Sequence, residues 1–295
     1  MSRPQFRITF SDRLVDIDFD IGQPELRCPN LWFENVVNAA PDYATEFNNQ
    51  GLAGHELAHR YGQHCVKHKI PKDMHFFDEL MRLQTEDGLF GYEFEAQEDF
   101  YQTAYNFASA VMFNPQLDHH FESRFAFERD TLKRLQVIDG PNRYNIAETC
   151  DYIAGTVDHF ALDKDKWIGY LTDYKMGYVN FDDWTAAETS LQMMLYAWAC
   201  FQLWPELQKV SATLWGPMWG RNNKAVATFE REDTLSKVST WLEYQWILID
   251  SYWADYGSKP WPAHEGDACT YCNIICPHYA ATADQYPEET MKVKL

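Results

Sequence analysis

Asp173 and Lys175 are the residues whose types and spacing point most directly to chemistry. They lie two positions apart at the end of a segment, 167–174, that reads as a strand, so both side chains leave the same face of a sheet. Asp158, on the preceding predicted strand, offers a second carboxylate. Carboxylates hold divalent metal ions, and an ammonium group beside them stabilises an attacking hydroxide or developing negative charge. These residues therefore predict a metal-dependent site suited to phosphodiester hydrolysis.

Further candidate residues flank this pair along the chain. His55 closes the Gly-rich segment Gly51-Leu-Ala-Gly-His55 at a predicted helix, and Glu122 lies on a predicted strand as a candidate for the outer shell of the site. Mg²⁺ and Mn²⁺ take mostly oxygen ligands, and one imidazole shifts the preference toward Mn²⁺. Gln192 and Tyr196 are four residues apart, so they share one face of a predicted helix.

Three of the seven cysteines crowd into one short segment as Cys269, Cys272 and Cys276. The odd number and the absence of an apolar secretion signal favour metal or cluster ligation over disulfides. Thiolates suit iron–sulfur clusters or zinc, and four are needed to close the shell. The fourth ligand would come from far upstream, where Cys28 and Cys65 are the candidates.

A rival motif overlaps the histidine. His55, Glu56 and His59 satisfy H-E-x-x-H, in which two histidines one helical turn apart bind zinc and the glutamate activates water. The longer form of that motif fails, because Cys65 occupies the third-ligand position and His64 comes one residue early. A zinc metalloprotease also leaves the Asp173, Lys175 and cysteine motifs unexplained, so it is the secondary hypothesis.

The elements expected to position these residues alternate between helices and strands. We expect an N-terminal hairpin or a pair of short strands over 5–20. We further expect helices over 44–69, 92–113, 183–204 and 234–256, and strands over 120–129, 144–162, 167–174, 208–216 and 225–231. This order predicts an α/β core.

Composition narrows the class of protein. The 295 residues are 46% hydrophobic, enough for a large core, and no apolar run reaches the length of a membrane helix, so we expect a soluble, cytoplasmic protein. The net charge of −19 argues against binding nucleic acid through general surface electrostatics. A locally basic groove would still allow nucleic acid to bind. The candidate residues for such a groove are Arg124, Arg129, Lys133 and Arg134. A non-catalytic DNA mimic or scaffold is a third hypothesis, which the intact acidic residues and lysine oppose.

The order and spacing of the motifs resemble the RecB-like branch of the PD-(D/E)XK nucleases, in the subgroup with a C-terminal iron–sulfur cluster. The resemblance covers roughly residues 25–280. It rests on these motifs: Gly51-Leu-Ala-Gly-His55, Gly155-Thr-Val-Asp158, Asp173-Tyr-Lys175, Gln192-Met-Met-Leu-Tyr196 and Cys269-x-x-Cys272-x-x-x-Cys276. The cysteine segment is shorter than is usual in that family.

The resemblance implies a site and cofactors. Lys175 would be the catalytic lysine, while Gln192 and Tyr196 would contact substrate. The ligands of Mg²⁺ or Mn²⁺ would be His55, Asp158 and Asp173. The [4Fe-4S] cluster would be held by Cys28, Cys269, Cys272 and Cys276.

The resemblance also implies a fold and a function. The fold is a restriction-endonuclease-like core with a mixed central sheet flanked by helices. We expect a single domain over 1–280, with a mostly helical part at 25–115, core sheet and helix at 116–232, a helix and cysteine loop at 233–280, and a tail at 281–295. The implied activity is a DNA exonuclease on single-stranded or end-bearing DNA. It would act with recombination or replication proteins in recombination, repair or phage DNA processing, in a bacterial or phage-infected cell.

Overall fold

The computed structural model describes residues 3–9, 15–17, 24–26, 29, 32–33, 46–88, 97–138, 144–175, 191–218, 221–259 and 261–262. Contacts divide the chain into two compact units. Unit 1 comprises Met1–Tyr43, Ala126–Gly155 and Ser236–Leu295, and unit 2 comprises Ala44–Phe125 and Thr156–Leu235. The division expected from the sequence, one domain over 1–280 with a tail, stays a prediction. None of the helices within the described ranges is long and apolar enough to cross a membrane.

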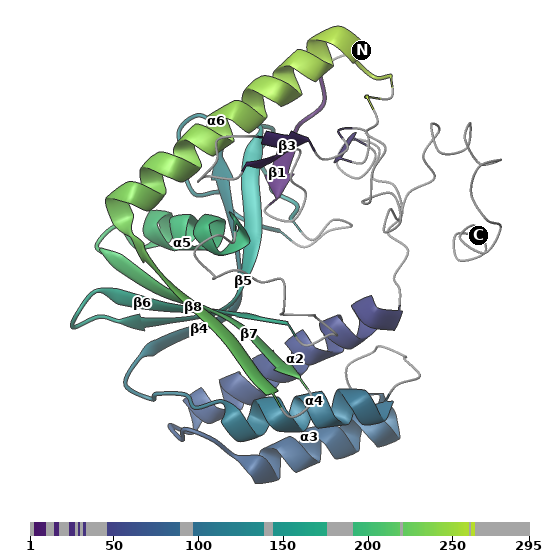
Figure 1. Ribbon diagram of the computed structural model, residues 1–295, viewed down its shortest axis with the longest axis vertical. Helices are drawn as coiled ribbons and strands as arrows, with labels where there is room; N and C mark the ends of the chain where they lie inside the picture. Colours follow the sequence, from purple (N-terminus) through teal and green to yellow (C-terminus); the bar gives the residue numbers. More distant parts are fainter. Residues whose placement is uncertain are drawn as a thin grey trace, which may run out of the picture. The chain divides into compact units, whose positions relative to one another are not determined.

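A mixed sheet forms the centre of unit 2 (Figure 1). The strands of the whole six-stranded sheet run in the order β1-β5-β6-β7-β8, with β4 pairing β5 and with β1 spanning Arg7–Thr9. The others are β4 (Asp118–Glu128), β5 (Tyr152–Asp163), β6 (Ile168–Tyr174), β7 (Lys209–Met218) and β8 (Arg221–Glu230). The β6–β7 pair is parallel, whereas β5–β6 and β7–β8 are antiparallel. The predicted α/β class with a mixed sheet flanked by helices is confirmed.

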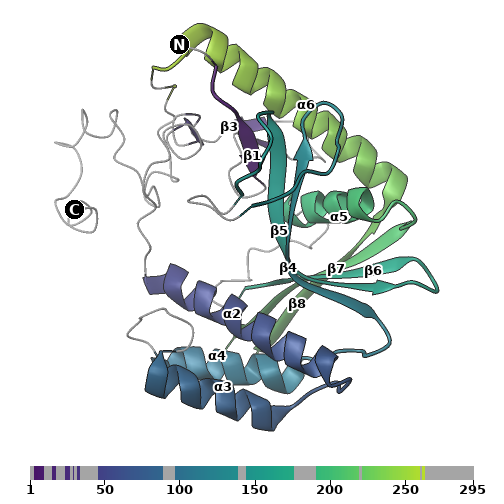
Figure 2. The ribbon, with the colours of Figure 1, turned by 180° about the vertical axis from the view of Figure 1, so that it is seen from behind.

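Helices cover both faces of this sheet (Figures 1 and 2). On one face lie α2 (Glu46–Lys67), α3 (Met74–Asp87) and α4 (Gln97–Ala110), and on the other lies α5 (Leu191–Leu203). Because α5 is buried on nearly every side, it is apolar all round rather than amphipathic. Residues 152–162 of β5 are all buried, as expected for a strand covered on both faces.

The helix α3 was not predicted from the sequence, although its ends carry clear signals. The Asp73 side chain accepts a hydrogen bond from the Phe76 amide at the N-terminus. Gly88 ends the helix in the left-handed conformation, at φ 62°, which glycine adopts without penalty. Phe77 and Leu80, three positions apart, bury one face of the helix in the core.

The core of unit 2 is rich in aromatic side chains. It joins α2, α3 and α4 to the sheet through a buried cluster that includes Tyr61, Phe77, Phe107, Phe113, Tyr174 and Trp215. The rings of Phe107 and Tyr174 meet edge to face at 5.2 Å between centroids. Tyr174 is the residue between Asp173 and Lys175, so this packing helps to fix the segment that carries both.

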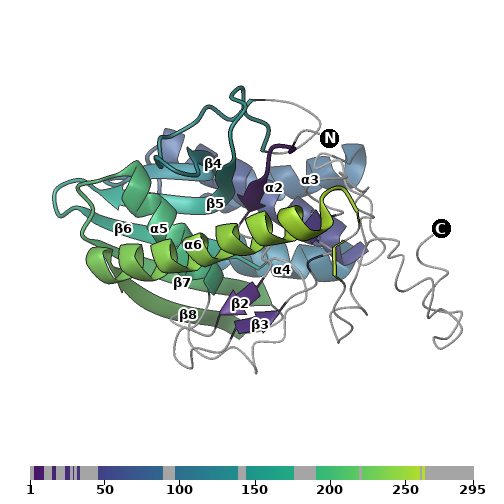
Figure 3. The ribbon, with the colours of Figure 1, turned by 90° about the horizontal axis from the view of Figure 1, so that it is seen from above.

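Unit 1 is built from three separated parts of the chain. The strand β1 (Arg7–Thr9) pairs in parallel with the start of β5, with Arg7 opposite Tyr152. A two-stranded antiparallel pair, β2 (Val15–Ile17) and β3 (Pro24–Leu26), lies side by side in Figure 3. Most of α6 (Arg231–Tyr256) also belongs to this unit.

Several elements differ from the sequence-based prediction. Residues 5–20 contain two short strands, which was one of the two predicted alternatives, but these do not form a hairpin, because β1 pairs with β5 and β2 pairs with β3. The predicted strand over 144–162 begins late, at Tyr152. Tyr144 and Ile146 instead pack against a small cluster around Leu135, and only an isolated bridge links Ile146 to Val137.

Candidate active site

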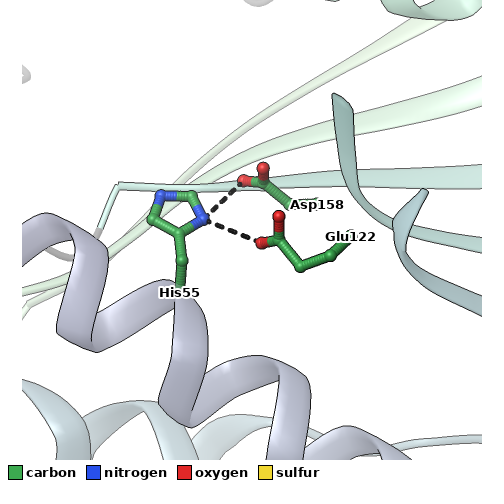
Figure 4. Close-up of side chains that lie close together, drawn as sticks. All are labelled: His55, Glu122 and Asp158. Carbon is green, nitrogen blue, oxygen red and sulfur yellow. Dashed lines mark ion pairs between the residues drawn. The ribbon is translucent and has the colours of Figure 1, made fainter. Parts of the chain in front are cut away.

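Three elements of unit 2 bring His55, Glu122 and Asp158 together (Figure 4). His55 lies on α2, Glu122 on β4 and Asp158 on β5. The Nδ1 atom of His55 is 3.4 Å from Oε1 of Glu122 and 3.4 Å from Oδ2 of Asp158. One ligand atom from each residue lies within 4.8 Å of the others, and no second such group occurs among the described residues.

Packing explains the direction of the His55 side chain. Ala53, Leu57 and Tyr61 of α2 are buried in the core cluster, which fixes the rotation of the helix. His55 lies off that buried face, with 29% of its side chain exposed, and reaches the carboxylates from one side. The sequence therefore places the imidazole through the helical spacing of its apolar neighbours.

Glu122 has an unusual backbone for a residue inside a strand. Its φ angle is +46°, in the left-handed region that residues with a Cβ rarely adopt. Such conformations persist where the surroundings over-determine them, and they concentrate at functional sites. Glu122 was predicted only for the outer shell of the site, whereas its carboxylate directly contacts His55.

Asp173 and Lys175 lie at the end of β6 and form an ion pair. The Lys175 Nζ atom is 2.7 Å from Oδ2 of Asp173, whose side chain is 2% exposed. This carboxylate oxygen is buried and receives no hydrogen bond of good geometry, so the ion pair only partly compensates its burial. Asp173 is absent from the group of three ligand atoms, which contains Glu122 in its place.

Burial and mutual repulsion set the protonation of the acidic residues. Burial, with a contribution from Asp158, raises the pKa of Asp173 to about 6, although Lys175 acts in the opposite direction. Burial also acts to raise the pKa of Asp158, but the charge and hydrogen bond of His55 outweigh it and lower that pKa. Burial disfavours the imidazolium, yet Asp158 and Glu122 raise the pKa of His55 to about 10.

Hydrogen bonds between side chains link Lys175 to α5. Lys175 donates to Oε1 of Gln192 at 3.1 Å, and Nε2 of Gln192 donates to the hydroxyl of Tyr196 at 3.1 Å. An ammonium group has donors only, so it selects the oxygen end of the amide and directs the nitrogen end toward the tyrosine. The four-residue spacing predicted the shared face, but the contact with Lys175 emerges only from the tertiary structure.

A second chain of polar side chains was missed by sequence analysis. The hydroxyl of Tyr174 lies 3.2 Å from Nδ1 of His159, and Nε2 of His159 lies 3.0 Å from Nδ1 of His119. The Nε2 atom of His119 is 2.7 Å from the carbonyl oxygen of Asn114. Burial lowers the pKa of His159 to about 3 and also lowers that of His119, so both rings are neutral at pH 7. The distance of forty residues between the histidines gave no sequence signal for their pairing.

The side chains of the H-E-x-x-H motif do not meet at one common metal position. His55 faces the carboxylates, while Nε2 of His59 lies 2.6 Å from Nε2 of Gln63. Glu56 forms an ion pair with Arg60, one turn along α2. These contacts do not support the zinc metalloprotease hypothesis.

The predicted cluster ligands Cys28, Cys269, Cys272 and Cys276 lie outside the described residues. Cys65, the other candidate for the fourth ligand, is fully buried in the core of unit 2. Burial raises the pKa of its thiol to about 11, so the thiolate that a metal requires is disfavoured there.

The basic stretch proposed as a groove is partly engaged in internal contacts. Arg129 forms ion pairs with Asp151 and Asp250 within unit 1, at 3.3 and 2.6 Å. Its charge is therefore balanced inside the protein. Arg124 lies in unit 2 and Arg129 in unit 1, so the stretch spans the division between the units.

The donor set fits a divalent cation. Two carboxylates and one imidazole nitrogen are ligands that Mg²⁺ and Mn²⁺ accept, with the nitrogen favouring Mn²⁺. The under-satisfied carboxylate oxygen of Asp173 is a further acceptor, and the raised pKa of Asp173 reflects the cost of burying its charge, with a smaller contribution from Asp158. A bound cation would remove that cost.

Comparison with known proteins agrees with this geometry. No curated protein matches the chain. A family model described as the PD-(D/E)XK nuclease superfamily matches residues 26–277, which is most of the chain. Members are nucleases that hydrolyse phosphodiester bonds, and the mixed sheet with flanking helices agrees with the restriction-endonuclease-like core. The chain thus belongs to the PD-(D/E)XK nuclease superfamily.

Proposed function

We propose that this chain is a metal-dependent deoxyribonuclease of the RecB-like branch. We further propose that it acts as an exonuclease on single-stranded or end-bearing DNA in recombination, repair or phage DNA processing. The observation that carries the proposal is the grouping of His55, Glu122 and Asp158 beside the Asp173–Lys175 pair. Carboxylates gathered in this way around an ammonium group match the needs of phosphodiester hydrolysis.

Each residue has a role that its environment supports. His55, Glu122 and Asp158, with Asp173 beside them, would hold Mg²⁺ or Mn²⁺. When bound, the cation supplies Lewis-acid activation of the phosphate and of a water molecule. Lys175 contributes a fixed positive charge for the negative charge that develops on the phosphate. Its bond to Gln192 holds the ammonium group near the carboxylates.

The motif on α5 supports two roles. By resemblance, Gln192 and Tyr196 contact substrate. Both groups of the Gln192 amide are engaged, by Lys175 and Tyr196, so the residue orients the lysine in the absence of DNA. We propose that its contact with DNA is made through the lysine it positions.

We also propose that Cys28, Cys269, Cys272 and Cys276 bind a [4Fe-4S] cluster that ties the two ends of the chain together. The support is the thiol spacing in the sequence and the unfavourable environment of Cys65. Protein purified without oxygen should contain about four irons per chain and show visible absorbance. One zinc per chain without colour would contradict this assignment.

The proposed activity is tested by measuring DNA cleavage in Mg²⁺ or Mn²⁺ by three proteins: the wild type, Lys175→Ala and Lys166→Ala. Lys166 is a matched control, because its ion pair with Asp163 resembles that of Lys175 with Asp173 but is largely exposed. Lys175→Ala should lower the cleavage rate by about 10²-fold or more, whereas Lys166→Ala should cleave like the wild type. Equal activity in all three chains would reject the assignment.

The choice of substrate separates the finer parts of the proposal. Linear single strands, linear duplexes and closed circles of the same sequence should be compared. An exonuclease requires an end, so circles should survive while linear DNA is degraded. Rapid cleavage of circles would instead indicate an endonuclease.

A further inference from the structure

A chain of hydrogen bonds runs from Tyr174 through His159 and His119 to the Asn114 carbonyl. The donor and the acceptor of each of these hydrogen bonds are fixed. A carbonyl oxygen only accepts, so the hydrogen of His119 lies on Nε2, 2.7 Å from that oxygen. The Nδ1 atom of neutral His119 must then accept, so His159 donates from Nε2 at 3.0 Å. This leaves Nδ1 of His159 to accept from the hydroxyl of Tyr174 at 3.2 Å. Every donor in the chain therefore has one defined acceptor.

The rings of this chain are packed as well as hydrogen-bonded. His119 and His159 lie within 4° of parallel, with centroids 5.3 Å apart. Phe121 stacks on His159 at 4.6 Å, and the plane of Tyr174 lies within 5° of that of His159. Packing of this kind restricts rotation of both imidazoles, so the hydrogen-bond directions are held rigidly.

The hydrogen-bond chain lies where the backbone pairing between β5 and β6 ends. The paired residues end at His159 opposite Thr172, and Asp158 and Asp173 lie just beyond. There the strands are joined through side chains: the Tyr174 amide donates to Oδ2 of Asp158 at 2.8 Å, and the Tyr174 hydroxyl reaches His159. One residue, Tyr174, thus links both sides of the carboxylate site.

We propose that Tyr174, His159 and His119 form a positioning chain that holds Asp158 and Asp173 at the spacing required to bind the divalent cation. The chain transmits this constraint from the segment before β4, at Asn114, to the end of β6. Outer partners that orient metal ligands typically affect metal affinity by about 10–100-fold when removed. This inference rests on the proposed metal site, and it adds three residues whose side chains would act by holding the proposed ligands in place.

Mn²⁺ binding to the whole protein tests the inference, with free Mn²⁺ measured by electron paramagnetic resonance. Tyr174→Phe removes only the hydroxyl of the chain. Tyr61→Phe is its control, because Tyr61 belongs to the same buried cluster and its hydroxyl is also hydrogen-bonded, accepting from the Asp73 amide. Tyr174→Phe should weaken Mn²⁺ binding about tenfold, while Tyr61→Phe should bind like the wild type.

The far end of the chain supplies a second variant. His119→Phe keeps an aromatic ring against Phe121 but removes both hydrogen bonds, and it should weaken Mn²⁺ binding in the same direction. Nitrogen-15 NMR should show His119 and His159 as Nε2–H tautomers in the wild type. The tautomer of His159 should stay Nε2–H in Tyr174→Phe, because His119 still accepts from it, and should become mixed in His119→Phe, which removes that acceptor.

Three results would count against the inference. Equal Mn²⁺ affinity in Tyr174→Phe and Tyr61→Phe would overturn the positioning role, and an Nδ1–H tautomer at His159 would overturn the chain itself. A wild type that binds no Mn²⁺ would overturn the proposed metal site and this inference together. The wild-type titration therefore distinguishes failure of the proposed function from failure of the positioning chain alone.

Discussion

Two groups of charged side chains in this protein follow opposite rules. In unit 1, Arg3 and Arg129 meet Asp151 and Asp250 in a salt-bridge network, and Arg129 also lies 3.5 Å from the exposed Asp130. Arg3 binds both oxygens of Asp151, at 3.0 and 2.6 Å. Each carboxylate faces an arginine, which is how a folded chain accommodates charge for structural purposes.

The carboxylate site of unit 2 holds more acidic than basic groups instead. Glu122, Asp158 and Asp173 share it with Lys175 and with His55, whose raised pKa makes it a second cation at neutral pH. The contrast appears in the titration of the acids: the arginines lower the pKa of Asp250 despite its partial burial, whereas burial raises the pKa of Asp173. A buried site with excess negative charge lowers the free energy of unfolding. Such a cost is expected where a bound cation supplies the compensating positive charge.

The sharpest way to test this contrast is the same substitution in both groups. Asp173→Asn should lower DNA cleavage by about 10²-fold or more, because it removes the negative charge that helps to hold the cation. Asp151→Asn should leave cleavage by the folded protein within about twofold of the wild type. Initial rates at saturating Mn²⁺ measure both. Similar losses of activity would mean that the two groups are not functionally distinct.

A smaller effect on activity is expected from the group that orients the lysine. Gln192→Leu keeps the size of the side chain but removes the oxygen that accepts from Lys175. Cleavage should fall about tenfold, mainly in kcat, because the ammonium group is held less well. Gln102→Leu is the control, since Gln102 is an exposed residue of α4 that bonds only to Asn106 among the contacts described. A change in KM alone would favour direct substrate contact by Gln192.

The salt-bridge network should dominate stability rather than activity. Asp151→Asn should lower the free energy of unfolding by about 2 kcal/mol, because a charge-assisted pair with Arg3 and the acceptor for the Phe6 amide are weakened. Urea denaturation monitored by tryptophan fluorescence measures this. An unchanged midpoint would show that the network contributes little.

The smallest expected effect is a gain in stability rather than a loss, and it depends on pH. The folded pKa of Asp173, about 6, exceeds the value of about 4 for an unfolded chain, so the native state binds the proton more tightly. Stability from this group is therefore present below pH 4 and is lost as pH rises toward 6. Asn does not titrate, so Asp173→Asn should gain about 1 kcal/mol over the wild type across this interval, measured with a chelator present. A constant difference from pH 4 to 6 would contradict the raised pKa.

Local spacing alone determined several parts of the site. Asp173 and Lys175 share a strand end because side chains alternate along a strand, and the structure pairs them at 2.7 Å. Gln192 and Tyr196 share a helix face because four residues make about one turn, and they are hydrogen-bonded. The helix carrying His55 and the strands carrying Asp158 and Asp173 were also predicted, since their apolar patterns are long and regular.

Tertiary structure decided everything that depends on distant segments meeting. The contact of Glu122 with His55, the stacking of His119 on His159 and the parallel pairing of β1 with β5 each join residues tens to more than a hundred positions apart. Sequence patterns report the period of one element, whereas such contacts depend on which elements pack together and in what register. For this reason the sequence specified the types of the candidate residues, and the folded sheet specified which of their ligand atoms lie close together.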